Sequence, residues 1–166
     1  MNFISRVLAF FYGKSREHYY KRRYNLYCET YDVDSSFKFN GTDIRLYGNG
    51  NIFLGENSYV GTNSTMHSCD DCQIIVGKNC QISHNVRIYT SSADPNQDFT
   101  KSKIKPSIKG DVLIGDGVWI GANAFINPGI RIGSNTVIGA NSVVTKNLEA
   151  NSIYGGVPAK LIKRKD

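Results

Sequence analysis

Histidine and cysteine are the residue types in this chain best suited to chemistry, and both are scarce. The histidines are His18, His67 and His84, and an imidazole that titrates near neutral pH can accept a proton from a reacting hydroxyl. Cys69 and Cys72 enclose two aspartates in a pattern that matches half of a zinc site. The sequence offers no second half, so we expect reduced thiols and no metal site.

The elements that must position such residues follow from a six-residue period. Aliphatic residues recur at this interval in the second half of the chain: Ile108, Ile114, Ile120, Ile126, Ile132, Ile138 and Val144. Small or β-branched residues usually stand four places after them: Val112, Val118, Ala124, Thr136 and Ser142. This period suits a short strand followed by a tight turn, which makes one side of a prism with three sides per coil. The aliphatic side chains should point into the prism, and Gly or Asn should form its corners.

The same register appears earlier in the chain and is interrupted once. It runs through Leu54, Val60, Met66, Val76, Ile82 and Ile88. Ile88 and Ile108 are then separated by a stretch without a clean repeat, "TSSADPNQDF" and its continuation, which we interpret as a loop over about 90–107. Long loops are uncommon in compact domains and often functional. The sequence therefore predicts an all-β parallel β-helix with one protruding loop, in which each coil is buried only by its neighbours.

The N-terminal segment differs from the rest in charge. Residues 1–24 hold six basic residues against the single acid Glu17, which is most of the formal net charge of +6. We expect a short helix or helix pair within 1–39 that caps the first coil of a β-helix spanning 40–166, with a tail at 147–166. The segment also suits an anionic membrane surface. The confined charge argues against nucleic-acid binding, and without a signal peptide we expect a cytoplasmic protein, peripheral at the inner face of the membrane.

Two stretches, "IGDGVWIGANAFINPGIRIGSNTVIGANSVVTKNL" and "NSIYGGVPAKLIKR", resemble the hexapeptide-repeat acyltransferases. The likeness is greatest to the sugar and polysaccharide O-acetyltransferases related to maltose and galactoside acetyltransferase, and it covers roughly residues 40–166. It implies a left-handed parallel β-helix, against the usual crossover rule. It also implies a homotrimer with active sites at subunit interfaces, where acetyl-CoA, the acyl donor, lies in the groove between adjacent prisms.

The resemblance assigns donor contacts residue by residue. Ala122 and Ala140 would lie against the pantetheine arm, where small side chains allow close approach of the backbone. Thr145, Lys146 and Lys160 would meet the nucleotide end and its phosphates, which suit cationic side chains. For any one of these positions, a purely structural role in the repeat is the alternative.

On the acceptor side, the resemblance assigns Asn63 and Asp71 to the sugar hydroxyls, although solvated corner residues would look the same. It also places Ala93 where the family carries a histidine that acts as general base. Alanine cannot accept a proton. Either the chain is an inactivated variant, or it is a natural non-catalytic relative, or another group such as His84 or His67 is the base.

The resemblance implies direct acetyl transfer from acetyl-CoA to a sugar hydroxyl of a surface polysaccharide or glycan. One alternative is N-acetylation of a nucleotide-linked amino sugar. Enzymes of that kind usually carry a further nucleotide-binding domain, whose glycine-rich strand-turn-helix does not precede the repeats here. The other alternative is a non-catalytic trimeric β-helix that binds ligands, for which Ala93 is the only positive sequence evidence.

Overall fold

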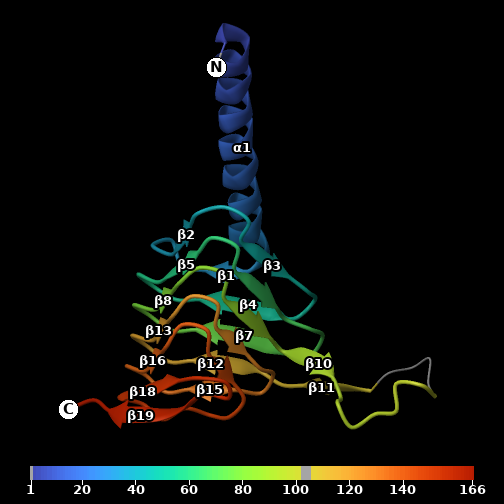
Figure 1. Cartoon of the computed structure of the whole chain (residues 1–166), viewed down its shortest axis with the longest axis vertical. Coiled ribbons are helices and arrows are strands. Elements are labelled where there is room, and N and C mark those ends of the chain that lie inside the picture. The colour runs from blue at the N-terminus through green and yellow to red at the C-terminus, as the bar shows by residue number, and fades with distance from the viewer. Residues whose placement is uncertain (1, 102–105) are drawn as a thin grey trace.

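A computed structural model describes residues 2–101 and 106–166, so Met1 and residues 102–105 of the predicted loop lie outside the described residues. The fold is a parallel solenoid of five three-stranded coils with one helix standing on its first coil (Figure 1). A hairpin arm leaves the solenoid from one side (Figure 1). The predicted parallel β-helix with a helical segment and one protruding loop is confirmed.

Strands of successive coils pair in register and form three faces. Face A contains β1 (Asp32–Val33), β4 (Asn51–Leu54), β7 (Gln73–Val76), β12 (Val112–Ile114) and β15 (Arg131–Ile132). Face B contains β2 (Lys38–Asn40), β5 (Tyr59–Gly61), β8 (Gln81–Ile82), β13 (Trp119–Ile120), β16 (Val137–Ile138), β18 (Ser152–Gly155) and, antiparallel at its edge, β19 (Lys160–Arg164). Face C contains β3 (Arg45–Tyr47), β6 (Thr65–His67), β9 (Arg87–Tyr89), β14 (Phe125–Ile126) and β17 (Val143–Val144). The first coil thus begins within the segment 1–39.

The core is a set of aliphatic columns, one behind each face. On face B, Val60, Ile82 and Ile120 occupy equivalent positions of successive coils and are fully buried. Burial of each such side chain contributes about 1.5–3 kcal/mol. The prediction was wrong for Ile108, which lies on β11 and is 46% exposed, because the chain has left the prism at that point. The inward series resumes at Ile114 and continues as expected.

Asparagines at positive φ form the corner between faces B and C. Asn63, Asn85, Asn123 and Asn141 have φ values of 59°, 56°, 62° and 59°, a backbone conformation that asparagine tolerates better than most residues. The Asn85 amide donates to Oδ1 of Asn123 at 2.7 Å, and the Asn123 amide donates to Oδ1 of Asn141 at 3.0 Å. These side-chain bonds fix the stacking of one coil on the next.

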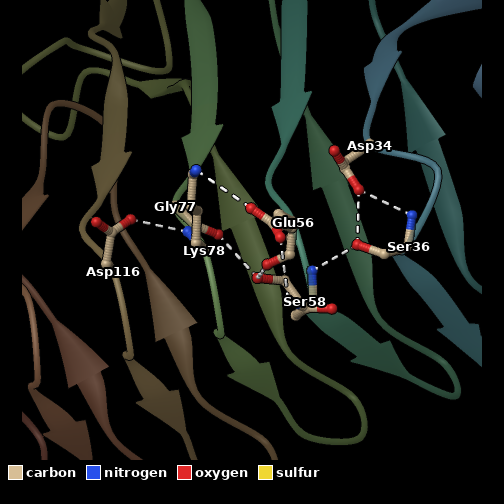
Figure 2. A network of polar contacts seen from close by, with 8 residues as sticks. Asp34, Ser36, Glu56, Ser58, Gly77, Lys78 and Asp116 are labelled. Carbon is tan, nitrogen blue, oxygen red and sulfur yellow. Dashed lines mark hydrogen bonds and ion pairs between the residues drawn. The ribbon is translucent and has the colours of Figure 1, made fainter.

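Polar contacts also hold the corner between faces A and B (Figure 2). The Ser58 hydroxyl donates to the Gly77 carbonyl at 2.8 Å, and the backbone N–H of Lys78 donates to the Asp116 carboxylate at 2.8 Å. The Lys78 ammonium lies 3.2 Å from the Glu56 carboxylate. Because this ion pair is exposed, it contributes little stability, and the bonds to the backbone are the ones that fix the register.

One continuous helix, α1 (Phe3–Thr30), precedes the coils, so the helix pair considered from the sequence does not form. The Asn2 side chain caps it by accepting from the Ser5 N–H at 2.9 Å. Near its other end, Tyr24 stacks on Phe39 of the first coil at 4.7 Å between ring centroids, and Tyr27 is buried. This end of α1 therefore covers the first coil as a cap. Within the described residues, no helix combines the length and apolarity needed to span a membrane.

The extra residues between coils gather at the corner between faces C and A. Equivalent residues of successive coils are separated in sequence by 22 residues between the second and third coils and by 38 between the third and fourth. Between the fourth and fifth coils the separation is 18 residues. The excess at the third coil forms the hairpin, in which β10 (Ser91–Ala93) pairs antiparallel with β11 (Ser107–Lys109). The N–H of Gly110 closes its base on the Thr90 carbonyl at 2.9 Å. The predicted loop is therefore an arm whose first residues are ordered as strands.

Candidate active site

The predicted site residues divide between the two edges of face C. The edge shared with face B carries Asn63, Ala122, Ala140 and Lys160. Lys160 is held at this edge because the N–H of its neighbour Ala159 donates to the Val143 carbonyl of face C at 2.8 Å. The edge shared with face A carries Asp71, Ala93, Thr145 and Lys146. On both edges, the predicted acceptor residues belong to earlier coils than the predicted donor residues. One chain therefore gathers these positions into two groups with face C between them.

Close backbone stacking explains the small residues on the edge between faces B and C. A Cβ atom added at Gly121 would lie 2.5 Å from the Ala140 nitrogen, so glycine is required there by the next coil. The carbonyl of Ala122 accepts from the N–H of Asn141 at 2.8 Å. Ala122 is partly buried and Ala140 is exposed, so a ligand could approach the backbone beside them.

On the edge between faces C and A, the turn that holds Asp71 packs against the base of the hairpin. The N–H of Cys69 donates to the Thr90 hydroxyl at 2.8 Å. Asp71 is exposed, with a φ of 63°. Ala93, also exposed, ends β10 opposite Ser107. The turn and the hairpin therefore form one continuous surface that could meet an acceptor.

The two cysteines of that turn differ in acidity. Burial opposes ionisation of Cys69, but hydrogen bonds from Thr90 and Cys72 outweigh it and lower the pKa of this thiol. Burial and the bond to Cys69 raise the pKa of Cys72. Both cysteines are free thiols. Among residues 2–101 and 106–166, no group of three or more His, Cys, Asp or Glu side chains is placed to hold a metal ion.

The two candidate histidines occupy different environments. His67 lies on face C, in register between Tyr47 and Tyr89, with ring centroids 4.7 Å and 6.1 Å from theirs. Its carbonyl accepts from the Thr90 N–H at 3.0 Å, which ties it to the base of the hairpin. His84 is an exposed residue of the corner between faces B and C. His67 is therefore the histidine that faces the same side of the prism as the hairpin base.

Sequence reasoning missed the outward side chains of face C. Arg45, Thr65 and Arg87 lie in register on β3, β6 and β9, and the Arg87 guanidinium donates to Oδ1 of Asn85 at 2.9 Å. Two shallow depressions of about 410 Å³ and 560 Å³ adjoin these three residues. They directly precede the buried residues Leu46, Met66 and Ile88, so the alternation within each strand was the signal that could have found them.

Family models match two stretches of the chain. One is described as bacterial transferase hexapeptide (six repeats) and matches residues 111–146, and the other is described as hexapeptide repeat of succinyl-transferase and matches residues 51–90. The galactoside O-acetyltransferase of Escherichia coli (strain K12) is 38% identical over 117 residues, which are 70% of this chain. This chain spans only 55% of that enzyme's length.

Two further proteins match a larger share of their own length. The chloramphenicol acetyltransferase of Escherichia coli is 34% identical over 145 residues, covering 70% of this chain and 69% of that enzyme. A hexapeptide-repeat acetyltransferase of Vibrio cholerae O1 biovar eltor, solved with acetyl coenzyme A, superposes with a TM-score of 0.69 at 26% identity, over 88% of this chain and 78% of that one. Together with the solenoid and its two matched repeat regions, these relatives show that the chain belongs to the hexapeptide-repeat acetyltransferase family.

Proposed function

We propose that this chain is an acetyl-CoA-dependent O-acetyltransferase that acts on a sugar hydroxyl of a surface polysaccharide or glycan. The observation that carries the proposal is the division of the predicted residues between the two edges of face C. In a homotrimer, one edge of each prism can face the opposite edge of its neighbour, which completes three equivalent sites. Donor and acceptor would then meet in a cleft between chains.

The chemistry needs positioning more than it needs a reactive side chain. The acceptor oxygen attacks the thioester carbonyl, the carbon–sulfur bond breaks, and coenzyme A leaves as the thiol once it has gained a proton. Holding both substrates in one cleft converts this into an effectively unimolecular step. Lys146 and Lys160 are exposed cations that suit the phosphates of the donor, and Ala122 and Ala140 leave room for its pantetheine arm.

The proton of the acceptor hydroxyl requires a base, and position 93 carries alanine. We propose that transfer by this chain is slow because the general base of the family is absent. His67 is the second candidate for this role, supported by its place on face C and its bond to Thr90 at the hairpin base. A non-catalytic binding protein is the alternative function that Ala93 favours, and turnover experiments separate it from a slow enzyme.

Acetyl-CoA binding tests the donor half of the proposal. Calorimetry should detect binding that weakens as salt is added, because part of the affinity is charge on phosphate. Lys160→Gln should weaken it several-fold, whereas Lys163→Gln, on the same strand β19, should leave it within about twofold. Absence of any binding at millimolar acetyl-CoA would reject the acetyltransferase proposal in favour of a structural β-helix.

We further propose that the reaction takes place in the cytoplasm, at the inner face of the membrane. The half of α1 that is remote from the coils carries exposed Phe3, Phe10 and Phe11. Basic residues follow from Lys14 to Arg23. Aromatic side chains followed by cationic ones suit an anionic lipid surface, which would keep the enzyme close to glycans assembled there.

A further inference from the structure

Arginines cluster on the outward surface of face C, where the proposed transfer reaction does not use them. Arg45 on β3 and Arg87 on β9 flank Thr65 of β6, in register across parallel strands. Arg23 of α1 lines the same depression of about 410 Å³. Three guanidinium groups thus come from three separate elements to one side of the first three coils.

Within the described ranges 2–101 and 106–166, none of these positive charges is neutralised by an ion pair with a carboxylate. Two of the three guanidinium groups, those of Arg87 and Arg23, are oriented by hydrogen bonds. The Arg87 guanidinium donates to the neutral Oδ1 of Asn85 at 2.9 Å, and Arg23 Nε donates to the Tyr27 hydroxyl at 2.7 Å. Such bonds hold a guanidinium in place while leaving its charge available to an anion.

One acid, Asp43, lies beside the cluster. Asp43 lines the adjoining depression of about 560 Å³, together with Arg45 and Arg87. One of its carboxylate oxygens accepts from the Tyr20 hydroxyl at 2.7 Å. Among the described residues, those that line the depression with all three arginines include no carboxylate, so the charged side chains that line it are all cationic.

The position of the cluster points to the acceptor and away from the donor. Asn63, which the family resemblance assigns to the acceptor, lines the depression that Arg45 and Arg87 share. Tyr47 and Tyr89 line the other depression and offer apolar ring faces beside the cations. Lys146 and Lys160, the cations suited to the donor phosphates, come shortly after β17 and at the start of β19. Figure 1 shows β18 and β19 at the end of the solenoid that is remote from α1.

We infer that the acceptor is a sugar that carries an anionic group, and that Arg45 and Arg87 bind this group. Guanidinium is suited to the task because its planar donors match two oxygens of a phosphate or a carboxylate at once. This inference rests on the proposed sugar acetyltransferase function. It adds that Arg45 and Arg87 select charged acceptors over neutral ones.

The test measures binding by NMR titration at matched ionic strength, with glucose 1-phosphate, glucuronic acid and glucose as probes. The variant is Arg45→Gln/Arg87→Gln, and the control is Arg131→Gln on β15 of face A. An anionic probe should bind at least about tenfold more tightly than glucose, and the double variant should lose about 10- to 100-fold of that affinity. The control should change by less than about twofold. The tighter of the two anionic probes identifies phosphate or carboxylate.

Two results would overturn the inference. One is equal binding of the three probes. The other is a loss of acetyl-CoA affinity in the double variant as large as its loss of affinity for the anionic probe, which would assign the arginines to the donor.

Turnover of the Ala93→His chain separates this inference from the proposed function. Anionic binding without acetyl transfer to any sugar keeps the arginine site and rejects the function, whereas equally fast transfer to neutral and anionic sugars keeps the function and rejects the site.

Discussion

At the scale of single residues, Ala93 is the position with the clearest expected effect. Ala93→His should increase acetyl transfer by about 10²–10⁴-fold, the usual contribution of a positioned general base. The turn that directly follows position 93 is formed in this chain, because the Asp94 carboxylate accepts from the Asn96 N–H at 2.9 Å. The measurement is thiol release from acetyl-CoA with a sugar acceptor.

The control for that substitution is its neighbour. Ser92 lies on the same strand β10, and adjacent side chains of a strand point to opposite sides, so Ser92→His should leave the rate unchanged. If the alanine chain turns over as fast as the Ala93→His chain, the base lies elsewhere, and His67→Ala becomes the decisive variant.

The residues that sequence reasoning found and missed differ in one physical respect. The inward aliphatic residues were predictable because each coil repeats them at a fixed interval. The relation of Arg45 to Thr65 and Arg87 depends on coil lengths that vary. Arg45 and Thr65 are 20 residues apart, whereas Thr65 and Arg87 are 22 apart. Until the position of the inserted residues is known, outward neighbours cannot be assigned.

At the scale of elements, the six-residue period predicted most of the prism and failed where the chain leaves it. Ile108 keeps the spacing of six from Ile114, but it belongs to the antiparallel hairpin. Spacing alone does not distinguish a strand of the solenoid from a strand of an arm that happens to keep the interval. The sequence left open whether the N-terminal segment forms one helix or two, because the apolar residues of α1 do not follow one face.

Burial inside the coils gives a prediction for stability. Ile126→Asp should cost more than about 4 kcal/mol, because it places an unpaired charge among stacked aliphatic side chains. Ile126 is fully buried on β14. Arg131→Asp, at an exposed position of β15, is the control and should change stability by less than about 1 kcal/mol. Circular dichroism during thermal unfolding measures both, and a native-like melting curve for Ile126→Asp would contradict the inward register.

The remote half of α1 gives a prediction for membrane association. Phe10→Ser/Phe11→Ser should weaken binding to anionic vesicles by about tenfold or more, because both rings are exposed and available to the lipid interface. Leu26→Ser changes an equally exposed apolar residue near the coils and should have little effect. Vesicle co-sedimentation with anionic and with zwitterionic lipid gives the comparison. Equal binding of all three chains would leave α1 with its capping role alone.

At the scale of the whole molecule, the two-edge arrangement predicts sites shared between chains. Light scattering should give about three times the chain mass of 18.5 kDa. In the Ala93→His background, Asp71→Ala and Ala140→Trp should each abolish transfer, because they damage opposite edges of face C. Co-expression of the two variants should restore activity at about a quarter of the interfaces, those formed by two intact edges. A monomer, or mixed chains that stay inactive, would place the whole site within one chain.

The antiparallel strand β19 has a consequence for solubility. A solenoid end presents unpaired backbone groups, on which another chain could add a coil and begin a filament. β19 pairs with β18 in the opposite direction to the rest of face B and carries Lys160, Lys163 and Arg164, the last in an ion pair with Glu149. A reversed, positively charged border repels a second copy of itself and offers the wrong polarity for coil addition. Together with the tyrosine-lined end of α1 on the first coil, it makes the stack a particle of fixed length instead of a polymer.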